Sequence, residues 1–223
     1  IRPERAVSLT YLRNNISHLV TLHSLVACCF LEHRKFRISH LHKFAALAHP
    51  FLQAELFLPW DQQQIITALD EAIGQLVMLG LLVRDEDGDT LSRTPDNPES
   101  VMQLRILAHS LLQTLHRYLI TISILARNGS GVLSRAELER LCIHTAQRIS
   151  MLHEFDAPEF YDKYLFKGFI AQLRKEGYLS PNPDNMLVFD RRLEQISTDA
   201  QFILGEAIRQ EIDRQTPLTE NGD

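Results

Sequence analysis

The chain has few cysteines and no apolar run long enough to span a bilayer. The three cysteines, Cys28, Cys29 and Cys142, form neither a disulfide framework nor a zinc-site spacing. An odd number that includes an adjacent pair is typical of a reducing, intracellular compartment. The most apolar run, residues 16–31, is shorter than the ~20 residues that cross a membrane, and it contains His18 and His23. We therefore expect this run to form a buried core helix.

The sequence also shows neither a signal-peptide pattern nor an excess of positive charge. The chain begins with Ile1 and shows no basic-then-apolar signal, so we expect it to be a piece of a longer chain. Its 23 Lys and Arg residues stand against 28 Asp and Glu residues, which gives a net charge of −5. This balance argues against a surface that neutralises many phosphates, although a local basic patch stays open. The length of 223 residues allows one large domain or two small ones.

Motifs for the common catalytic and metal chemistries are absent. There is no H-E-x-x-H, no Cys/His cluster at finger spacing and no G-x-S-x-G. The glycines of "ARNGSGVLS", residues 126–134, fit a helix end and loop rather than a phosphate-binding loop. His40 and His42 face different ways on a helix, and His109 and His116 share a face without an evident carboxylate partner. We therefore predict no catalytic residue, no metal ligand and no cofactor, and the substrate-binding residues stay unknown.

The stretch "GLLVRDEDGDTLS", residues 80–92, invites a calcium-loop interpretation because three carboxylates alternate along it: Asp85, Asp87 and Asp89. An EF-hand loop needs Gly at its sixth position and Glu at its twelfth. Here Gly88 is fourth and Asp96 is twelfth, so the ligand pattern fails. Asp-Gly is instead a favoured pair for a tight hairpin in which both central residues adopt φ > 0. We expect a hairpin with a solvated tip, and a metal loop is the alternative.

Apolar periodicity predicts helices along the first half of the chain. A central helix is expected over about residues 11–34, because this segment is apolar on nearly all sides. The side chains expected inside include Leu19, Val20, Val26 and Phe30. Ser39 is expected to cap a second helix over residues 40–51.

The third helix has clear start and stop signals. Asp61, with Gln64 three residues later, resembles a capping box, and the helix is expected to end at Gly80. A hairpin should follow, with strands near residues 81–83 and at Leu91.

The second half follows the same order. A long helix is expected from Asn97 to Asn128, and Ser134 with Glu137 resembles the capping box of the next helix. A third helix over residues 160–176 should end at Gly177. Strands are then expected at residues 178–179 and 187–189, followed by a C-terminal helix over about 190–214.

The segment 153–163 gathers His153, Asp156, Glu159 and Asp162 among aromatic residues. Carboxylates beside a His can do acid–base work. Asp156 and Glu159, however, occupy capping positions of the predicted third helix, with Pro158 in its first turn. We therefore expect a structural role for this segment.

Three helices closed by a two-stranded hairpin are typical of the winged-helix pattern. We predict a mainly α fold with two short β-hairpins, built as tandem winged-helix-like repeats plus a C-terminal helix. The expected domains are residues 1–96, 97–190 and 191–223. The third helix of the first repeat is acidic and poor in Lys and Arg, and the basic clusters at 34–37 and 191–192 are short. We therefore do not expect nucleic acid as a partner, and a tandem winged-helix nucleic-acid- or protein-binding module remains the alternative.

Five ordered blocks carry a resemblance to the bacterial membrane-associated glycerol-3-phosphate acyltransferases: "IRPERAVSLTYLRNNISHLVTLHSLVA", "LHRYLITISILA", "TAQRISMLH", "DAPEFYDK" and "LRKEGYLS". The first block resembles the segment that follows the catalytic domain of those enzymes. The resemblance implies a parent enzyme that transfers an acyl group from acyl-CoA or acyl-carrier protein to glycerol 3-phosphate and makes lysophosphatidate. The family's catalytic His-x4-Asp motif and its Pro-Glu-Gly-Thr phosphate-binding core are missing from this chain.

The resemblance therefore implies a C-terminal region without the active site of the family. Its expected role is to support the catalytic domain, to self-associate or to dock a partner. The implied partners are the upstream catalytic domain, the acyl donor and glycerol 3-phosphate of the parent, and a membrane surface, with a homo-oligomer left open. The implied location is peripheral, on the cytoplasmic face of the cell membrane.

Overall fold

The computed structural model describes residues 19–94, 97–152, 158–193, 195–196, 210 and 214. This part of the chain is mainly α-helical with small antiparallel sheets, which confirms the predicted class. The chain forms two compact units, residues 1–112 and 113–223, and the boundary lies within helix α4 (Pro98–Asn128). The domain boundaries expected at 96/97 and 190/191 remain predictions.

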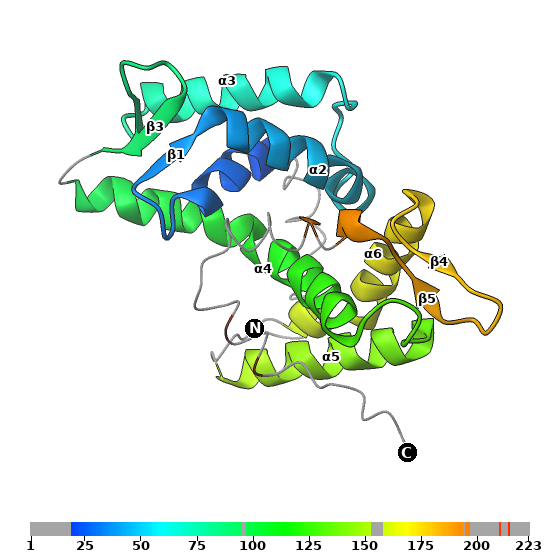
Figure 1. Ribbon diagram of the computed structural model, residues 1–223. Helices are drawn as coiled ribbons and strands as arrows, with labels where there is room; N and C mark the ends of the chain where they lie inside the picture. The colour runs from blue at the N-terminus through cyan, green and yellow to red at the C-terminus, as the bar shows by residue number, and fades with distance from the viewer. Residues whose placement is uncertain are drawn as a thin grey trace. The chain divides into compact units, whose positions relative to one another are not determined.

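The first unit contains the helical residues 19–29, then β1 (Lys35–Arg37), α2 (Ile38–Leu56), α3 (Gln64–Met78), β2 (Leu82–Arg84) and β3 (Thr90–Arg93) (Figure 1). The strands form an antiparallel sheet in the order β1-β3-β2. The hairpin expected near 81–83 and Leu91 is therefore confirmed. Strand β1 was not expected, because a basic tripeptide has no strand signal of its own. Its Phe36 is buried opposite Leu91.

Helix α2 begins two residues earlier than expected, and its cap is not Ser39. Ser39 lies inside the first turn, and its main-chain N–H and its hydroxyl both donate to the Asp89 carboxylate at 3.0 Å. The N-cap residue, Arg37, makes no side-chain cap bond. The hairpin residue Asp89 therefore accepts a hydrogen bond from a free N–H group at the start of α2. Because Asp89 is distant in sequence, a local capping pattern does not predict this bond.

The tip of the first hairpin differs from the expected tight turn. The Gly88 N–H donates to the Asp85 carbonyl at 3.1 Å, and the Asp85 N–H donates to the Thr90 carbonyl at 2.8 Å. Gly88 has φ +73°, whereas Asp87 is not among the residues with positive φ. Asp87 and Gly88 thus do not both adopt φ > 0, and the loop is a type I turn followed by a left-handed glycine.

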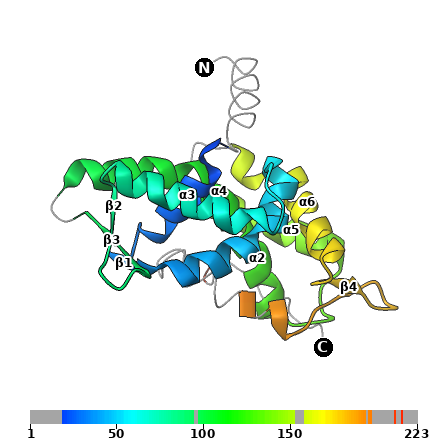
Figure 2. The same cartoon turned by 90° about the horizontal axis from the view of Figure 1, so that it is seen from above.

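Helix α3 begins at Gln64, two residues later than expected, and its predicted start and stop signals are both present. The Asp61 carboxylate accepts from the Gln64 N–H at 2.8 Å, and the Gln64 side chain accepts from the Asp61 N–H at 3.2 Å, which confirms the capping box. At the other end Gly80, with φ +70°, and Leu81 donate their N–H groups to the last carbonyls of the helix. This geometry is a Schellman motif, which favours glycine. Helices α2 and α3 lie side by side (Figure 2).

The helix over residues 19–29 is buried along most of its described length. Val26 and Phe30 are 0% and 1% exposed, as expected. Leu19 and Val20 are 62% and 36% exposed, so the prediction that they are inside is wrong. Other elements cover the helix from Thr21 onward, and an apolar sequence pattern does not reveal where that cover begins.

The second unit contains the later part of α4, then α5 (Arg135–Leu152), the 3₁₀ helix η1 (Pro158–Tyr161), α6 (Lys163–Lys175), β4 (Ser180–Pro181) and β5 (Leu187–Val188). Helix α4 ends at Asn128, as predicted. The Ser134 hydroxyl accepts from the Glu137 N–H at 3.3 Å, and the Glu137 carboxylate accepts from the Ser134 N–H at 2.8 Å. The second capping box is therefore confirmed.

Helix α6 begins later than expected. Residues 158–161 form a 3₁₀ turn, and Asp162 is the N-cap, because its carboxylate accepts from the Tyr164 N–H at 2.7 Å. The predicted start at residue 160 is thus wrong. The helix ends as predicted at Gly177, with φ +73°, whose N–H donates to the Arg174 carbonyl.

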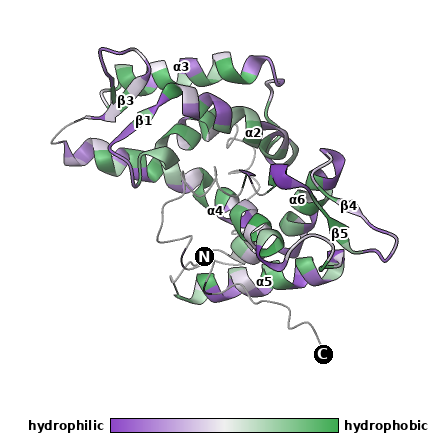
Figure 3. Ribbon diagram, viewed as in Figure 1, coloured by the Kyte–Doolittle hydropathy of each residue, from purple (hydrophilic) through white to green (hydrophobic). Residues whose placement is uncertain are grey.

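The second hairpin is confirmed, and it adds to the parallel between the two units. Strands β4 and β5 pair antiparallel; β4 lies two residues after its expected position, and β5 lies within its expected range. The Gly131 N–H donates to the Leu187 carbonyl, and the Leu187 N–H donates to the Leu133 carbonyl, at 2.8 and 2.7 Å. The chain before α5 therefore runs along β5, as β1 runs along β3 in the first unit. Both hairpin tips are hydrophilic (Figure 3).

The expected C-terminal helix is described at a few positions, and residues 191–193, 195–196, 210 and 214 are helical. Residue 190 is described and is not helical, and the remaining positions of the 190–214 prediction lie outside the described residues. Across the described ranges, no helix combines the length and apolarity that a membrane crossing requires.

Candidate functional site

The three carboxylates of the first hairpin all bond to protein groups. Asp85 accepts from the Lys35 ammonium and the Ser92 hydroxyl, each at 2.7 Å, and these two bonds lower its pKa. Asp87 accepts from the Thr90 hydroxyl at 2.6 Å and from its N–H at 2.8 Å, which lowers the pKa of Asp87. Asp89 caps α2. Among residues 19–94, 97–152 and 158–193, no three His, Cys, Asp or Glu side chains gather as metal ligands.

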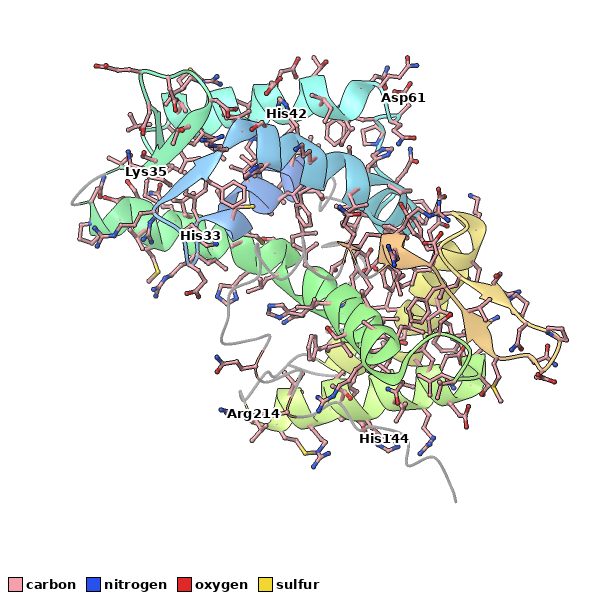
Figure 4. The ribbon with its side chains drawn as sticks, in the orientation of Figure 1. His33, Lys35, His42, Asp61, His144 and Arg214 are labelled. Carbon is pink, nitrogen blue, oxygen red and sulfur yellow. The ribbon has the colours of Figure 1, made fainter. Side chains whose placement is uncertain are left out.

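The histidines of the first unit bond to neighbouring elements. His42 of α2, labelled in Figure 4, bonds to Asp70 of α3 at 2.8 Å. His49 contacts the Trp60 carbonyl at 2.8 Å. On α4, His109 is exposed whereas His116 is 2% exposed, so the two do not share a solvent-facing site. The bonds of His42 and His49 and the burial of His116 indicate structural roles.

The cysteine thiols are poor candidates for nucleophilic chemistry. Cys28, Cys29 and Cys142 are free and buried. Burial raises the pKa of Cys28 and of Cys142 to about 12 and also raises the pKa of Cys29. The nucleophile is the thiolate, and burial of this kind disfavours it near neutral pH.

The two other candidate segments of the second unit also have structural contacts. Asp162 is the cap of α6, while His153 and Asp156 lie outside the described residues. In the loop 129–131, the Ser130 hydroxyl donates to the Phe189 carbonyl at 3.0 Å and accepts from the Phe189 N–H at 2.8 Å. These two hydrogen bonds hold the loop against the end of the second hairpin. The basic pair 191–192 is exposed, and Arg192 contacts Asp190 at 2.9 Å.

The exposed faces of the helices differ in charge between the two units. The outward residues of α3 are Gln64, Thr67, Asp70, Glu71, Gly74, Gln75 and Met78. This face carries two carboxylates and no cation, as the sequence indicated. By contrast, α6 exposes four cations: Lys163, Lys167, Arg174 and Lys175. The acidity of the α3 face is predicted from the sequence, whereas the cations of α6 were not singled out from it.

Helix α5 carries a second cationic surface, which we call the basic face of α5 and define by Arg140, His144, Arg148, Met151 and Leu152. All five residues are exposed. Figure 4 shows His144 pointing away from the ribbon of the second unit. The i, i+4, i+8 spacing of the first three residues is visible in the sequence and could have indicated this face.

The two carboxylates of α5 itself bond to other residues. Glu137 bonds to Ser134 in the capping box, and this bond lowers its pKa. Glu139 is 2.8 Å from Arg135 and 3.7 Å from Lys167, so it links α5 to α6. Within the described part of the chain, Arg140 and Arg148 have no carboxylate within ion-pair distance.

Comparison with known proteins points to one family. Residues 1–182 match the family model described as the glycerol-3-phosphate acyltransferase C-terminal region. The chain is 44% identical over 222 residues to the glycerol-3-phosphate acyltransferase of Xanthomonas axonopodis pv. citri (strain 306), covering 99% of this chain and 25% of that protein. It is 45% identical over 216 residues to that of Xylella fastidiosa (strain 9a5c), covering 96% and 25%.

A more distant relative agrees with these two. The glycerol-3-phosphate acyltransferase of Pseudomonas entomophila (strain L48) is 38% identical over 214 residues, covering 96% of this chain and 26% of that protein. The chain thus spans about a quarter of the length of the curated relatives it matches. No solved structure matches the chain.

Proposed function

Since the chain belongs to the glycerol-3-phosphate acyltransferases, as their C-terminal region, we propose that it is a non-catalytic domain that supports the catalytic part of a longer enzyme. The parent transfers a fatty acyl group from acyl-CoA or acyl-carrier protein to a hydroxyl of glycerol 3-phosphate and releases lysophosphatidate. The chain contributes by bracing the upstream catalytic domain, by self-association or by docking a partner. The parent works at the cytoplasmic face of the cell membrane as a peripheral protein.

The observation that carries this proposal is that the carboxylates considered as catalytic or metal-binding groups instead make hydrogen bonds that hold the fold together. The hairpin carboxylates bond to Lys35, Thr90 and Ser39, and Asp162 caps α6. Acyl transfer needs a base within hydrogen-bond reach of the hydroxyl and a cationic site for the phosphate. None of the ten histidines is followed five residues later by Asp, the spacing that the family resemblance implies for the catalytic pair.

The fold that we propose for this domain is a tandem of winged-helix-like units. In the first unit the order is helix, strand, helix, helix, hairpin, and the early strand β1 pairs with the last strand β3. In the second unit, the segment 131–134 takes the place of that early strand, since it pairs with β5. This shared order supports the repeat, because a winged helix is a helix-turn-helix variant closed by a hairpin.

An acyl-transfer assay on two proteins tests the non-catalytic role. Residues 1–223 alone should not convert glycerol 3-phosphate and acyl-CoA to lysophosphatidate, whereas the same chain extended upstream through the catalytic domain should do so. His153→Ala in the extended protein should leave kcat/KM largely intact. Turnover by residues 1–223 alone that is lost on His153→Ala would overturn the proposal.

The second candidate function is a nucleic-acid-binding tandem winged helix. The four exposed cations of α6 favour it, whereas the acidic face of α3 and the net charge of −5 oppose it. A titration of the chain with duplex DNA at low and at physiological salt decides between the two. We expect no salt-dependent binding, and tight binding that weakens steeply with salt would support the nucleic-acid function.

A further inference from the structure

We propose that the basic face of α5 docks on the surface of an anionic phospholipid bilayer. This inference deepens the peripheral membrane location and rests on that part of the proposed function. It supplies the means of attachment, which neither the family membership nor the proposed reaction specifies. The face was defined above by Arg140, His144, Arg148, Met151 and Leu152.

The outward direction of this face follows from the burial of the opposite side of α5. The inward residues are 0–6% exposed: Leu138, Leu141, Cys142, Ala146 and Ile149. At 100° per residue, Arg140, His144, Arg148 and Met151 fall within a sector of roughly 80°, and Leu152, the last residue of the helix, lies about 40° beyond it, just past the buried Leu141. From Arg140 to Leu152 the face is about 18 Å long at 1.5 Å per residue. It can therefore lie flat against a surface while the apolar side stays in the core.

The charge of the face is available to an external partner. Arg140 and Arg148 carry fixed positive charge at any physiological pH. Glu137 and Glu139, the acidic residues of α5, are held by Ser134 and by Arg135 with Lys167. Cations near an anionic leaflet are attracted within about one Debye length of its surface. Because the chain as a whole has a net charge of −5, an anionic surface repels most of it and attracts the basic face of α5, which orients the chain on that surface.

The apolar residues at the end of the face favour an anionic bilayer over DNA or an acidic protein as the partner. Met151 is 80% exposed and Leu152 is 58% exposed, directly after the cations. Basic residues beside exposed apolar residues on one helix are typical of helices that lie in a membrane interface. A duplex offers phosphates but no apolar layer beside them, and an acidic protein surface need not offer one. A bilayer provides both, since its headgroups lie directly above the acyl chains.

Co-sedimentation with vesicles tests the proposal on the 223-residue chain. We expect the chain to bind vesicles of phosphatidylcholine mixed with phosphatidylglycerol and not vesicles of phosphatidylcholine alone. The double variant Arg140→Gln/Arg148→Gln should weaken the partition about 25-fold, at about fivefold for each cation lost near an anionic surface. The double variant Met151→Gln/Leu152→Gln should weaken it severalfold, because apolar side chains no longer enter the interface.

A matched control removes the same charge from another surface. Lys43→Gln/Arg105→Gln takes two exposed cations from the first unit and should leave the partition within twofold of the unchanged chain. All of these positions are exposed, so each variant should keep the far-ultraviolet circular dichroism and melting temperature of the parent chain. Added salt should weaken binding of the unchanged chain more than that of Arg140→Gln/Arg148→Gln.

Several outcomes would overturn the proposal. Equal partition to both kinds of vesicle, or an equal loss in the control variant, would show that the basic face of α5 does not select anionic lipid. Binding to duplex DNA or to an acidic protein that the Arg140→Gln/Arg148→Gln variant loses, without a preference for anionic vesicles, would assign the face to that partner. Because the vesicle assay involves no turnover, its failure is distinguishable from failure of the acyl-transfer assay.

Discussion

Replacing Asp89 should loosen the start of α2, although the two lie 50 residues apart in sequence. Its carboxylate accepts two hydrogen bonds of 3.0 Å from Ser39, one from the main-chain N–H and one from the hydroxyl. Loss of an N-cap costs about 0.5–2 kcal/mol, and a hydrogen bond to a charged group contributes about 1.5–3 kcal/mol. Asp89 is half-buried, so solvent moderates both contributions. We expect Asp89→Ala to cost about 2 kcal/mol.

Two control variants separate the cap from charge and from the hydroxyl. Glu86→Ala removes the same charge from the same loop, where the side chain is exposed, and should change the unfolding free energy by less than about 0.5 kcal/mol. Ser39→Ala removes one of the two bonds and should cost about half as much as Asp89→Ala. Urea denaturation measures the global effect, and amide hydrogen exchange measures the local one.

The exchange experiment provides the sharper test. In Asp89→Ala, the amide of Ser39 should lose protection, while amides in the middle of α3 should keep theirs. Local loss is expected because the carboxylate bonds to the first turn of α2 and to no other helix in the described structure. If Asp89→Ala behaved like Glu86→Ala in both measurements, the cap would contribute nothing and our account of the start of α2 would be refuted.

Three further predictions concern the core, a helix end and pH. Phe30→Ala should lower the unfolding free energy by about 3–5 kcal/mol in urea denaturation, while Leu19→Ala, at an exposed position of the helix that ends just before Phe30, should change it by less than about 0.5 kcal/mol. Gly177→Ala should cost about 1–2 kcal/mol because φ is +73°, and Gly177→Asn should cost less; equal costs would contradict the left-handed cap. The pKa values of Asp85 and Asp87 are lowered in the folded chain from an ordinary 3.8, mainly by side-chain hydrogen bonds. The stability they provide is therefore present above pH 3.8 and is lost as pH falls through their lowered pKa values, which denaturation at a series of acidic pH values checks.

The sequence by itself determined the features that rest on local interactions. The capping boxes at Asp61 with Gln64 and at Ser134 with Glu137 depend on residues three apart, and both were correctly predicted. The stop of a helix at a left-handed glycine is equally local, since a residue without Cβ adopts φ > 0 at little cost. The family resemblance likewise came from ordered blocks of sequence, and it agrees with the family match.

Tertiary structure decided the features that depend on residues far apart in the chain. Strand β1 exists because β3 lies beside it, and α2 is capped because the hairpin carries Asp89 to its first turn. Burial along the first helix also depends on which elements cover it, so Val26 is inside and Val20 is partly outside although both are valines. The spacing of Arg140, His144 and Arg148 is visible in the sequence, but their exposure depends on the packing of the opposite side of α5 in the fold. The sequence supplies the donors, acceptors and charges, but pairing across dozens of residues requires the fold to bring them within bonding distance.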